Sequence, residues 1–339
     1  MRHSHGINMG TQWGFASFDE ATSHPKTIDA KREFIAHYPT IREARQDTRG
    51  LGLLIFAWEH ILGPIGVHRL EAVKHRTNAA IVGRHTACNL SVPDKYHEVS
   101  LRHVLVLVRA ISRDEVRIRV IDLNTEGGFF DESGRTLRAV AAEGSVFLRI
   151  GRLTLLLLVT DPDDGPPDDA HDAYDCIPER VFLEEESGLF KRPGFRAGAD
   201  RTLALGVRHL QGGSRATIVT AQAEPVFSCR ALPEHDEAIA GTVRLGHDES
   251  PRQPVGLSAL RRGIMFGRYE RCDLASRDWS DRISRVHFML IDDHGDTLGV
   301  DLASSNGTFR KGERVKVCKL SGDDKVTLAG SIEVGWRRA

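Results

Sequence analysis

The chain has 339 residues, 40% of them hydrophobic, which is enough for about two globular domains and excludes an intrinsically disordered polymer. Lysine and arginine number 46 against 47 aspartates and glutamates. The resulting net charge of −1 excludes a global positive field that would recruit nucleic acid or an acidic membrane. Any site for an anion must therefore be built from local groups.

The cysteines are odd in number, far apart and without a CxxC pair, which favours reduced thiols in a cytoplasm over a disulfide framework. No residues have the spacing of a metal site, and no motif indicates a cofactor. The start of the chain lacks the pattern of a secretory leader, and the longest apolar run, Leu51 to Ala57, is too short to span a bilayer. We expect a cytoplasmic protein with no metal, no cofactor, no membrane insertion and no nucleic-acid partner.

Residues 1–48 form a polar tail in which only residues 28–46 place apolar side chains at helical spacing. Pro39 interrupts that pattern, so we expect a tail that is only partly helical. Thr22 follows Asp19 and Glu20 in the polar part, and it is the kind of hydroxyl that a Ser/Thr kinase can reach.

From Leu51 the pattern changes to short apolar strands separated by turn residues, which predicts a β-sandwich over residues 49–160. The last expected strand, residues 153–159, is apolar without alternation, which indicates burial of both of its faces. The earlier strands are expected at residues 51–58, 67–73 and 79–82.

Residues 161–178 are rich in aspartate and proline, with seven Asp and three Pro but no lysine or arginine between Asp161 and Asp175. This composition predicts an extended linker between two folded bodies. Residues 179–240 are β-rich, and they can form a small β-domain or an added layer on the sandwich that follows. The expected features are strands at 180–184, 202–207, 216–221 and 225–232 and a turn at Gly212-Gly213.

Residues 241–339 contain three polar motifs at the expected ends of strands. Gly267-Arg268 ends one apolar strand, Ser284-Arg285-Val286-His287 opens the next, and Ser304-Ser305-Asn306-Gly307-Thr308 forms a turn. Because the loops of a β-sandwich gather at its ends, we expect these motifs to meet on one rim.

The chemistry of these motifs suits an anion that is attached to a peptide. Arg268 offers a planar fork of donors for phosphate oxygens, Ser284 offers a hydroxyl, and Asn306 offers an amide that donates and accepts. Gly267 and Gly307 allow the backbone to approach a ligand closely.

With these motifs in this order, residues 241–337 resemble the forkhead-associated (FHA) domain, whose pattern is GR, SxxH and NG. The resemblance implies an eleven-stranded β-sandwich that binds phosphothreonine peptides. It implies that Arg268 and Ser284 contact the phosphate and that Arg285 and Ser305 flank it. It also implies that Asn306 contacts the peptide backbone. It assigns structural support of the loops to Gly267, His287, Gly307 and Thr308.

The same motifs occur earlier in the chain, which indicates a tandem repeat. Gly83 and Gly267 are 184 residues apart, and the same offset relates Arg84 to Arg268, Cys88 to Cys272, Leu90 to Leu274, Ser100 to Ser284, and His103 to His287. At Asp122 and Asp301 the offset is 179, so the first copy should have a hairpin that is about five residues longer.

The first copy departs from the FHA pattern where a ligand would be recognised. Leu101 stands in the place of Arg285, and Glu126-Gly127 stands in the place of Ser305-Asn306. The carboxylate of Glu126 would repel a phosphate. The residues that can still form a weak anion site are Arg84 and Ser100. We expect this copy to serve as a packing or dimerisation module.

The predicted fold is all-β, with two FHA-like β-sandwiches, an intervening β-rich segment and a short, partly helical N-terminal region. The leading functional hypothesis is phosphothreonine-peptide recognition by the second copy, in an intracellular signalling or assembly adaptor. The alternative is a phosphate-independent scaffold that uses both sandwiches for protein contacts. FHA relatives in bacteria commonly accompany Ser/Thr kinases or secretion machines, so the resemblance implies a phosphothreonine-containing partner from such a setting. Phosphorylated Thr22 would be an internal ligand for the same site.

An enzyme is not expected. Ser284 and His287 are three positions apart in an expected strand, where they would point to opposite faces and could not form a nucleophile and base pair.

Overall fold

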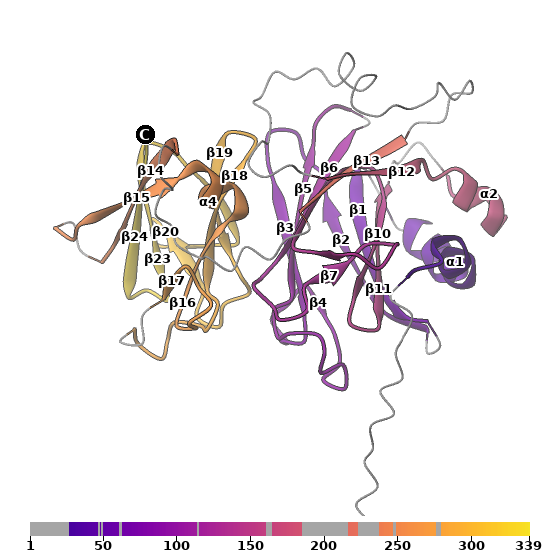
Figure 1. The fold of residues 1–339 in the computed structure, drawn as a ribbon, viewed down its shortest axis with the longest axis horizontal. Coiled ribbons are helices and arrows are strands. Elements are labelled where there is room, and N and C mark those ends of the chain that lie inside the picture. The colour runs from indigo at the N-terminus through magenta and orange to yellow at the C-terminus, as the bar shows by residue number, and fades with distance from the viewer. Residues whose placement is uncertain are drawn as a thin grey trace, which may run out of the picture.

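The computed structural model describes residues 27–46, 48, 50–60, 63–113, 115–160, 165–184, 216–222, 237–246, 249–275 and 279–339. These residues form two β-sandwiches that lie side by side (Figure 1). Four expected features fall outside the described residues, namely Thr22, the strands at 202–207 and 225–232, and the turn at Gly212-Gly213.

The first sandwich contains β1 (Gly52–Glu59), β2 (Gly63–Glu71), β3 (Asn78–Gly83), β4 (Leu90–Ser91), β5 (Val104–Ala110), β6 (Val116–Asp122), β7 (Phe129–Phe130), β8 (Thr136–Leu137), β9 (Ala139–Glu143), β10 (Val146–Ile150) and β11 (Leu153–Thr160). One sheet has the order β2-β1-β11-β10-β7-β8, and in the other β9, β6, β5, β3 and β4 are successive neighbours.

The second sandwich contains β14 (Ile239–Leu245), β15 (Arg252–Gly256), α4 (Leu257–Arg262), β16 (Ile264–Gly267), β17 (Leu274–Ala275), β18 (Phe288–Asp293), β19 (Asp296–Asp301), β20 (Thr308–Arg310), β21 (Glu313–Val315), β22 (Val317–Leu320), β23 (Asp323–Leu328) and β24 (Ile332–Arg338). Its sheets, β15-β14-β24-β23-β20-β21 and β17-β16-β18-β19-β22, repeat the strand order of the first sandwich strand for strand. The second sandwich thus has eleven strands among the described residues, six in one sheet and five in the other, and the predicted all-β fold is confirmed.

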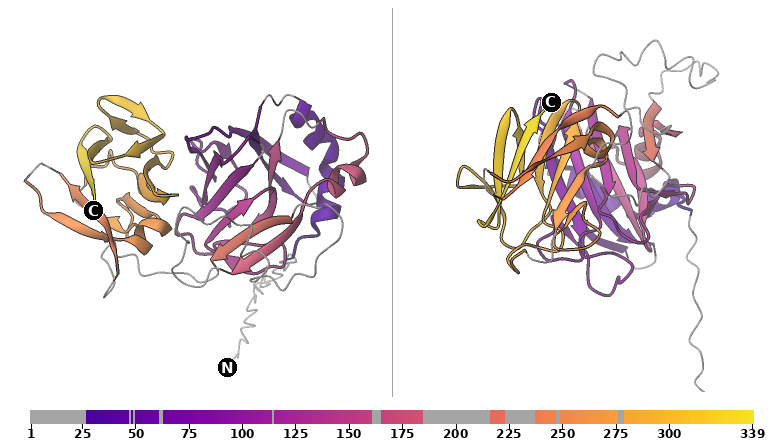
Figure 2. Two further views of the ribbon diagram at one scale, coloured as in Figure 1. Left: turned by 90° about the horizontal axis from the view of Figure 1, so that it is seen from above. Right: turned by 60° about the vertical axis from the view of Figure 1, so that its left-hand side comes forward.

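Two helices cover the outer face of the sheet that contains β1 and β11. They are α1 (Ala30–Gln46) and α2 (Ala170–Asp175), and both lie on the side of the first sandwich that faces away from the second (Figures 1 and 2). Phe34 and Ile41 of α1 pack on outward-facing residues of the sheet such as Phe56 and Leu156. Burial of this face explains why Pro39 does not end the helix, although it removes a backbone hydrogen bond.

The acidic segment 161–178 was expected to be extended, and this expectation is wrong for its second half. Residues 170–175 form α2, which begins because the Asp169 carboxylate accepts hydrogen bonds from the first backbone N–H groups of the helix. The segment is also docked on α1, since Lys31 forms an ion pair with Asp175 over 2.9 Å and Tyr38 donates a hydrogen bond to the Pro167 carbonyl. Asp169 and Asp175 thus have local partners, so residues 165–178 are not a self-repelling spacer.

The strands that follow join the first sandwich, which neither of the two arrangements expected for residues 179–240 included. They are β12 (Glu179–Glu184) and β13 (Ala216–Gln222), and the sheet order is β12-β13-β9-β6-β5-β3-β4. Strand β13 pairs antiparallel with β9, and β12 pairs parallel with β13. The β9 edge of the first sandwich is therefore covered by these strands, which protects it from pairing with other chains.

The two sandwiches pack against each other through an apolar interface. Alternation along β18 sends Phe288 and Leu290 into the core of the second sandwich and sends Met289 and Ile291 toward the first. The interface cluster contains Ile81, Cys88, Leu105, Leu107, Ile121, Leu123, Met265, Cys272, Met289, Ile291, Leu298, Val300 and Leu302. Each sandwich contributes its third, fifth and sixth strand, so equivalent faces meet. This packing explains why these strands are apolar on both faces.

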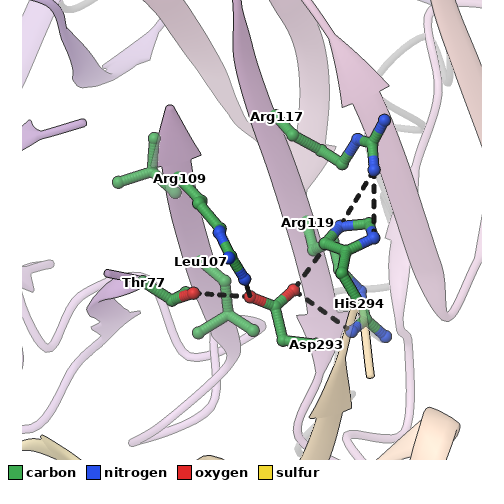
Figure 3. A pocket seen from close by; sticks show the side chains of 8 residues that line it. Thr77, Leu107, Arg109, Arg117, Arg119, Asp293 and His294 are labelled. Atoms are coloured by element: carbon green, nitrogen blue, oxygen red, sulfur yellow. Dashed lines mark hydrogen bonds and ion pairs between the residues drawn. The ribbon is translucent and has the colours of Figure 1, made fainter. Parts of the chain in front are cut away.

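A polar cluster closes one end of this interface (Figure 3). Asp293, at the end of β18, accepts a hydrogen bond of 2.5 Å from the Thr77 hydroxyl and lies 3.8 to 3.9 Å from guanidinium nitrogens of Arg109 and Arg119. The neighbouring His294 contacts Arg117. Burial and the three arginines lower the pKa of His294 to about 4, although Asp293 acts in the opposite direction, so the imidazole is neutral at physiological pH.

None of the helices in the described part of the chain is long and apolar enough to cross a membrane.

Candidate functional site

Three loops at one end of the second sandwich bring the predicted site residues together. They are residues 268–273 after β16, residues 280–287 before β18 and residues 302–307 before β20, and we call them the rim of the second sandwich. Backbone hydrogen bonds join the loops, since the Arg268 N–H donates to the Ser284 carbonyl and the Leu302 N–H donates to the His287 carbonyl.

Arg268 is fixed at the rim but stays accessible. Its Nε donates to the Ile283 carbonyl over 2.6 Å, and its Nη1 contacts the Asp281 carboxylate over 2.5 Å. The arginine side chain is 31% exposed, whereas that of Asp281 is 97% exposed. An ion pair with so exposed a partner contributes little, and another anion can replace the carboxylate.

Ser284 and His287 form a support inside the rim. The backbone N–H of Ser284 donates to His287 Nδ1 over 3.1 Å, and His287 Nε2 donates to the Gly307 carbonyl over 3.1 Å. Burial lowers the pKa of His287, more strongly than the Gly307 carbonyl and Asp301 raise it. The ring is therefore a neutral brace between two loops.

Both residues lie in the loop ahead of β18, which begins at Phe288, so the expectation that they open the strand is wrong. The argument that these two side chains point to opposite faces of a strand therefore does not apply. The hydrogen bonds argue against a nucleophile and base pair in another way. Both ring nitrogens of His287 bond to backbone groups, and neither bonds to the Ser284 hydroxyl.

The loop 302–307 is shaped by Asp301, which the sequence motifs did not include, and by Ser304, the first residue of the predicted turn. Asp301 accepts hydrogen bonds from the backbone and hydroxyl of Ser304, over 2.9 and 2.5 Å, and from the Thr308 hydroxyl over 2.8 Å. Ser304 in turn accepts a hydrogen bond from the Gly307 N–H over 2.9 Å. The signal for Asp301 was its match to Asp122 at the repeat offset.

This arrangement presents Ser305 and Asn306 to solvent. The Ser305 N–H donates to the Ser284 hydroxyl over 3.0 Å, and Asn306 Nδ2 donates to the Arg282 carbonyl over 2.7 Å. Arg285, expected beside them, is exposed and forms no side-chain hydrogen bond or ion pair with another described residue.

Two glycines are required by the close approach of these loops. A Cβ atom at Gly267 would lie 2.2 Å from the Arg285 carbonyl oxygen. Gly307 has a φ of +79°, and a Cβ there would meet the Arg314 side chain at 2.6 Å. Both positions therefore need glycine for the rim to form.

The first sandwich builds the same framework at its own end. Arg84 Nε donates to the Val99 carbonyl over 2.5 Å, and the Ser100 N–H donates to His103 Nδ1 over 3.0 Å. His103 Nε2 contacts the Gly128 carbonyl over 2.8 Å, and burial lowers the pKa of this histidine too.

The exposed groups at that end differ. Glu126 was expected to oppose a ligand as a free charge, but its carboxylate forms an ion pair of 2.6 Å with Arg271 of the second sandwich. Asn124 Nδ2 also donates to the Arg271 carbonyl over 2.8 Å. The loop that would recognise a ligand is thus engaged at the interface between the sandwiches. Among the described residues no three His, Cys, Asp or Glu side chains converge as metal ligands would.

Comparison with known proteins finds a match within the second sandwich. The family model of the FHA domain matches residues 264–329. The comparison with curated proteins found no match.

Several solved structures are similar. One is Mycobacterium tuberculosis EmbR in complex with a low affinity phosphopeptide, with 20% identity, a TM-score of 0.26, and coverage of 30% of this chain and 25% of that one. Another is the FHA-1 domain of M. tuberculosis Rv1747, with 20% identity, a TM-score of 0.26, and coverage of 30% and 98%. A third is the FHA domain of an Arabidopsis thaliana hypothetical protein, with 22% identity, a TM-score of 0.26, and coverage of 31% and 92%.

Proposed function

We propose that the rim of the second sandwich binds a phosphothreonine-containing segment of another protein. The observation that carries this proposal is the position of Arg268, which is anchored through Nε while its Nη1 pairs, among the described residues, only with an exposed carboxylate. A phosphothreonine carries a charge of about −1.5 to −2 and three acceptor oxygens, so it can replace Asp281 with a stronger, charge-assisted contact.

The neighbouring groups suit the remainder of such a ligand. Ser284 places its hydroxyl beside the same loop, and Arg285 and Ser305 are free to flank the phosphate. Asn306 is exposed, and no described residue donates a hydrogen bond to its Oδ1, so its amide can pair with the backbone of an extended peptide. Gly267, His287, Gly307 and Thr308 act as supports in this proposal.

For the first sandwich we propose a divergent FHA-like copy that serves packing. Arg84 and Ser100 retain the framework positions, but the carboxylate of Glu126, which pairs with Arg271, stands where the second copy has Ser305 and would repel a phosphate. The whole chain then acts as a cytoplasmic adaptor without catalytic activity, whose partner is a phosphorylated protein of a kinase pathway or of an assembly such as a secretion machine.

A degenerate phosphothreonine peptide library tests this proposal on the full chain. We expect enrichment of phosphothreonine peptides over the same library treated with phosphatase and over a phosphoserine library. Equal binding before and after phosphatase treatment would instead support the phosphate-independent scaffold.

A further inference from the structure

One residue of the first sandwich reaches the rim of the second. Arg102 lies just ahead of β5, is 9% exposed, and donates to the Ala303 carbonyl from both Nε, over 3.2 Å, and Nη2, over 2.6 Å. Ala303 begins the turn that continues into Ser304, Ser305 and Asn306. A buried, charged donor is therefore fixed on the backbone at the base of the proposed peptide-binding loop.

The backbone at this point needs support. Ala303 has a φ of 54°, in the left-handed region that residues other than glycine rarely adopt. This conformation turns the chain so that Ser304 meets Asp301, which in turn sets the positions of Ser305 and Asn306. Such a conformation persists only where surrounding contacts hold it.

An arginine of the second sandwich makes a similar contact to the first sandwich. Asn124 occupies the position of Ala303 in the first sandwich, has the same φ of 54°, and its carbonyl accepts a hydrogen bond from Arg271 Nη1 over 3.4 Å. Each sandwich thus uses an arginine to hold the left-handed residue of the other. The contact of Arg102 is the shorter of the two, and it acts on the loop that carries Asn306.

We propose that the first sandwich is a built-in brace for the peptide site of the second, and that Arg102 is the positioning residue through which it acts. Arg102 does not touch the peptide in this scheme. It holds the loop 303–306 in the conformation that presents Ser305 and Asn306. The role of this loop in peptide binding rests on the proposed function.

The alternative is that Arg102 only contributes to adhesion between the sandwiches. Arg109 separates the two possibilities, because it also lies at the interface but at the other end of β5, where it faces Asp293 and Asp296. The two arginines are seven positions apart along a stretch that is mostly strand, which corresponds to at most about 23 Å. Loss of Arg109 therefore weakens the interface without affecting the loop 303–306 directly.

Hydrogen–deuterium exchange of the full chain without peptide provides the first test. The amides of Ser305 and Gly307 donate to Ser284 and Ser304, and they report on the loop. In Arg102→Met, which keeps the aliphatic stem, we expect these amides to exchange about tenfold faster or more, as loss of a charge-assisted hydrogen bond implies. Arg109→Met should leave them unchanged.

Affinity for the best phosphothreonine peptide from the library provides the second test. We expect about a tenfold loss in Arg102→Met, partial recovery in Arg102→Lys, which can donate one hydrogen bond, and wild-type affinity in Arg109→Met. Wild-type exchange and affinity in Arg102→Met would overturn the brace, as would equal loop effects from both arginine variants. If the wild type selects no phosphothreonine peptide while exchange still accelerates in Arg102→Met, the proposed function fails and the bracing contact stands.

Discussion

In both sandwiches an arginine follows the third strand, a neutral buried histidine joins two loops, and an aspartate organises the turn ahead of the seventh strand. Arg84 and Arg268 make the same hydrogen bond to a carbonyl, and His103 and His287 make the same bridge. Only the second sandwich adds Ser305 and Asn306 on the exposed side. The comparison teaches that the residues that shape a rim and the residues that bind at it can change independently.

The outer faces of the two sandwiches differ as well. The first is covered on one side by α1 and α2 and on the other by the second sandwich. The corresponding helix-free face of the second sandwich carries ion pairs, such as Arg244 with Glu333 over 3.1 Å and Lys325 with Glu333 over 2.8 Å. The first sandwich is therefore covered on both faces, whereas this outer face of the second sandwich is polar among the described residues.

The largest effect is expected at the interface between the sandwiches. Ile291→Ala and Leu107→Ala, at equivalent positions and each at most 1% exposed, should each lower the free energy of unfolding by about 2 to 5 kcal/mol. Urea unfolding of the full chain measures this loss. Leu101→Ala is the control, because Leu101 is 39% exposed and should change stability little. Losses below about 1 kcal/mol at both interface positions would mean that the faces do not meet in solution.

The next effect separates the two rims. Arg268→Ala should weaken binding of a phosphothreonine peptide about 10- to 150-fold, because a charged contact worth about 1.5 to 3 kcal/mol is lost. Arg84→Ala removes the matching framework hydrogen bond from the first sandwich, so it controls for structural damage and should leave the affinity unchanged. Isothermal titration of both full-length variants decides the matter. Equal losses would show that the lost affinity comes from damage to the framework and not from a lost phosphate contact, and no loss in either variant would remove Arg268 from the site.

Much of the fold could be predicted because matching residues recur in the sequence at two constant offsets, 184 and then 179 residues. Gly83 and Gly267 need glycine, since a Cβ at either would lie within 2.4 Å of a carbonyl oxygen, and His103 and His287 need the same two hydrogen bonds. Residues under such constraints keep their spacing, so a single sequence reveals them. The longer hairpin of the first copy is confirmed, with β5 and β6 separated by residues 111–115 and β18 and β19 by 294–295.

Long-range packing could not be predicted in the same way. Strand β13 joins β9 of the first sandwich, although the sequence between them contains β10, β11, α2 and β12, and no local pattern encodes that pairing. Met289 and Ile291 make the outer face of β18 apolar, but the sequence does not indicate which strands of the first sandwich cover that face. Arg102 carries no motif, because its role depends on a carbonyl 201 residues away.

Acidification should weaken both sandwiches through their equivalent histidines. Burial lowers the pKa of His103 and of His287 in the folded chain, so below the usual pKa of about 6.5 the unfolded chain binds more protons. Their stabilising effect is present above that pH and is lost as the pH falls below it. Urea midpoints at pH 7.5 and 5.5 measure the loss. His103→Gln and His287→Gln should each be less stable but less sensitive to pH, and an undiminished pH dependence in both would contradict this origin.

The smallest effect concerns how the peptide backbone is recognised. Asn306→Ala should weaken peptide binding about 2- to 12-fold, the range for one neutral hydrogen bond of about 0.5 to 1.5 kcal/mol. Because Asn306 is proposed to pair with the peptide chain and not with its charge, the affinity of the rim for inorganic phosphate should be unchanged in this variant. Gly127→Asn places the same side chain on the first sandwich, where the neighbouring carboxylate of Glu126 repels a phosphate, and should not create a second site. If inorganic phosphate at low millimolar concentration displaced the peptide from the wild type completely, and Asn306→Ala bound the peptide normally, the rim would be a simple anion site without recognition of the chain.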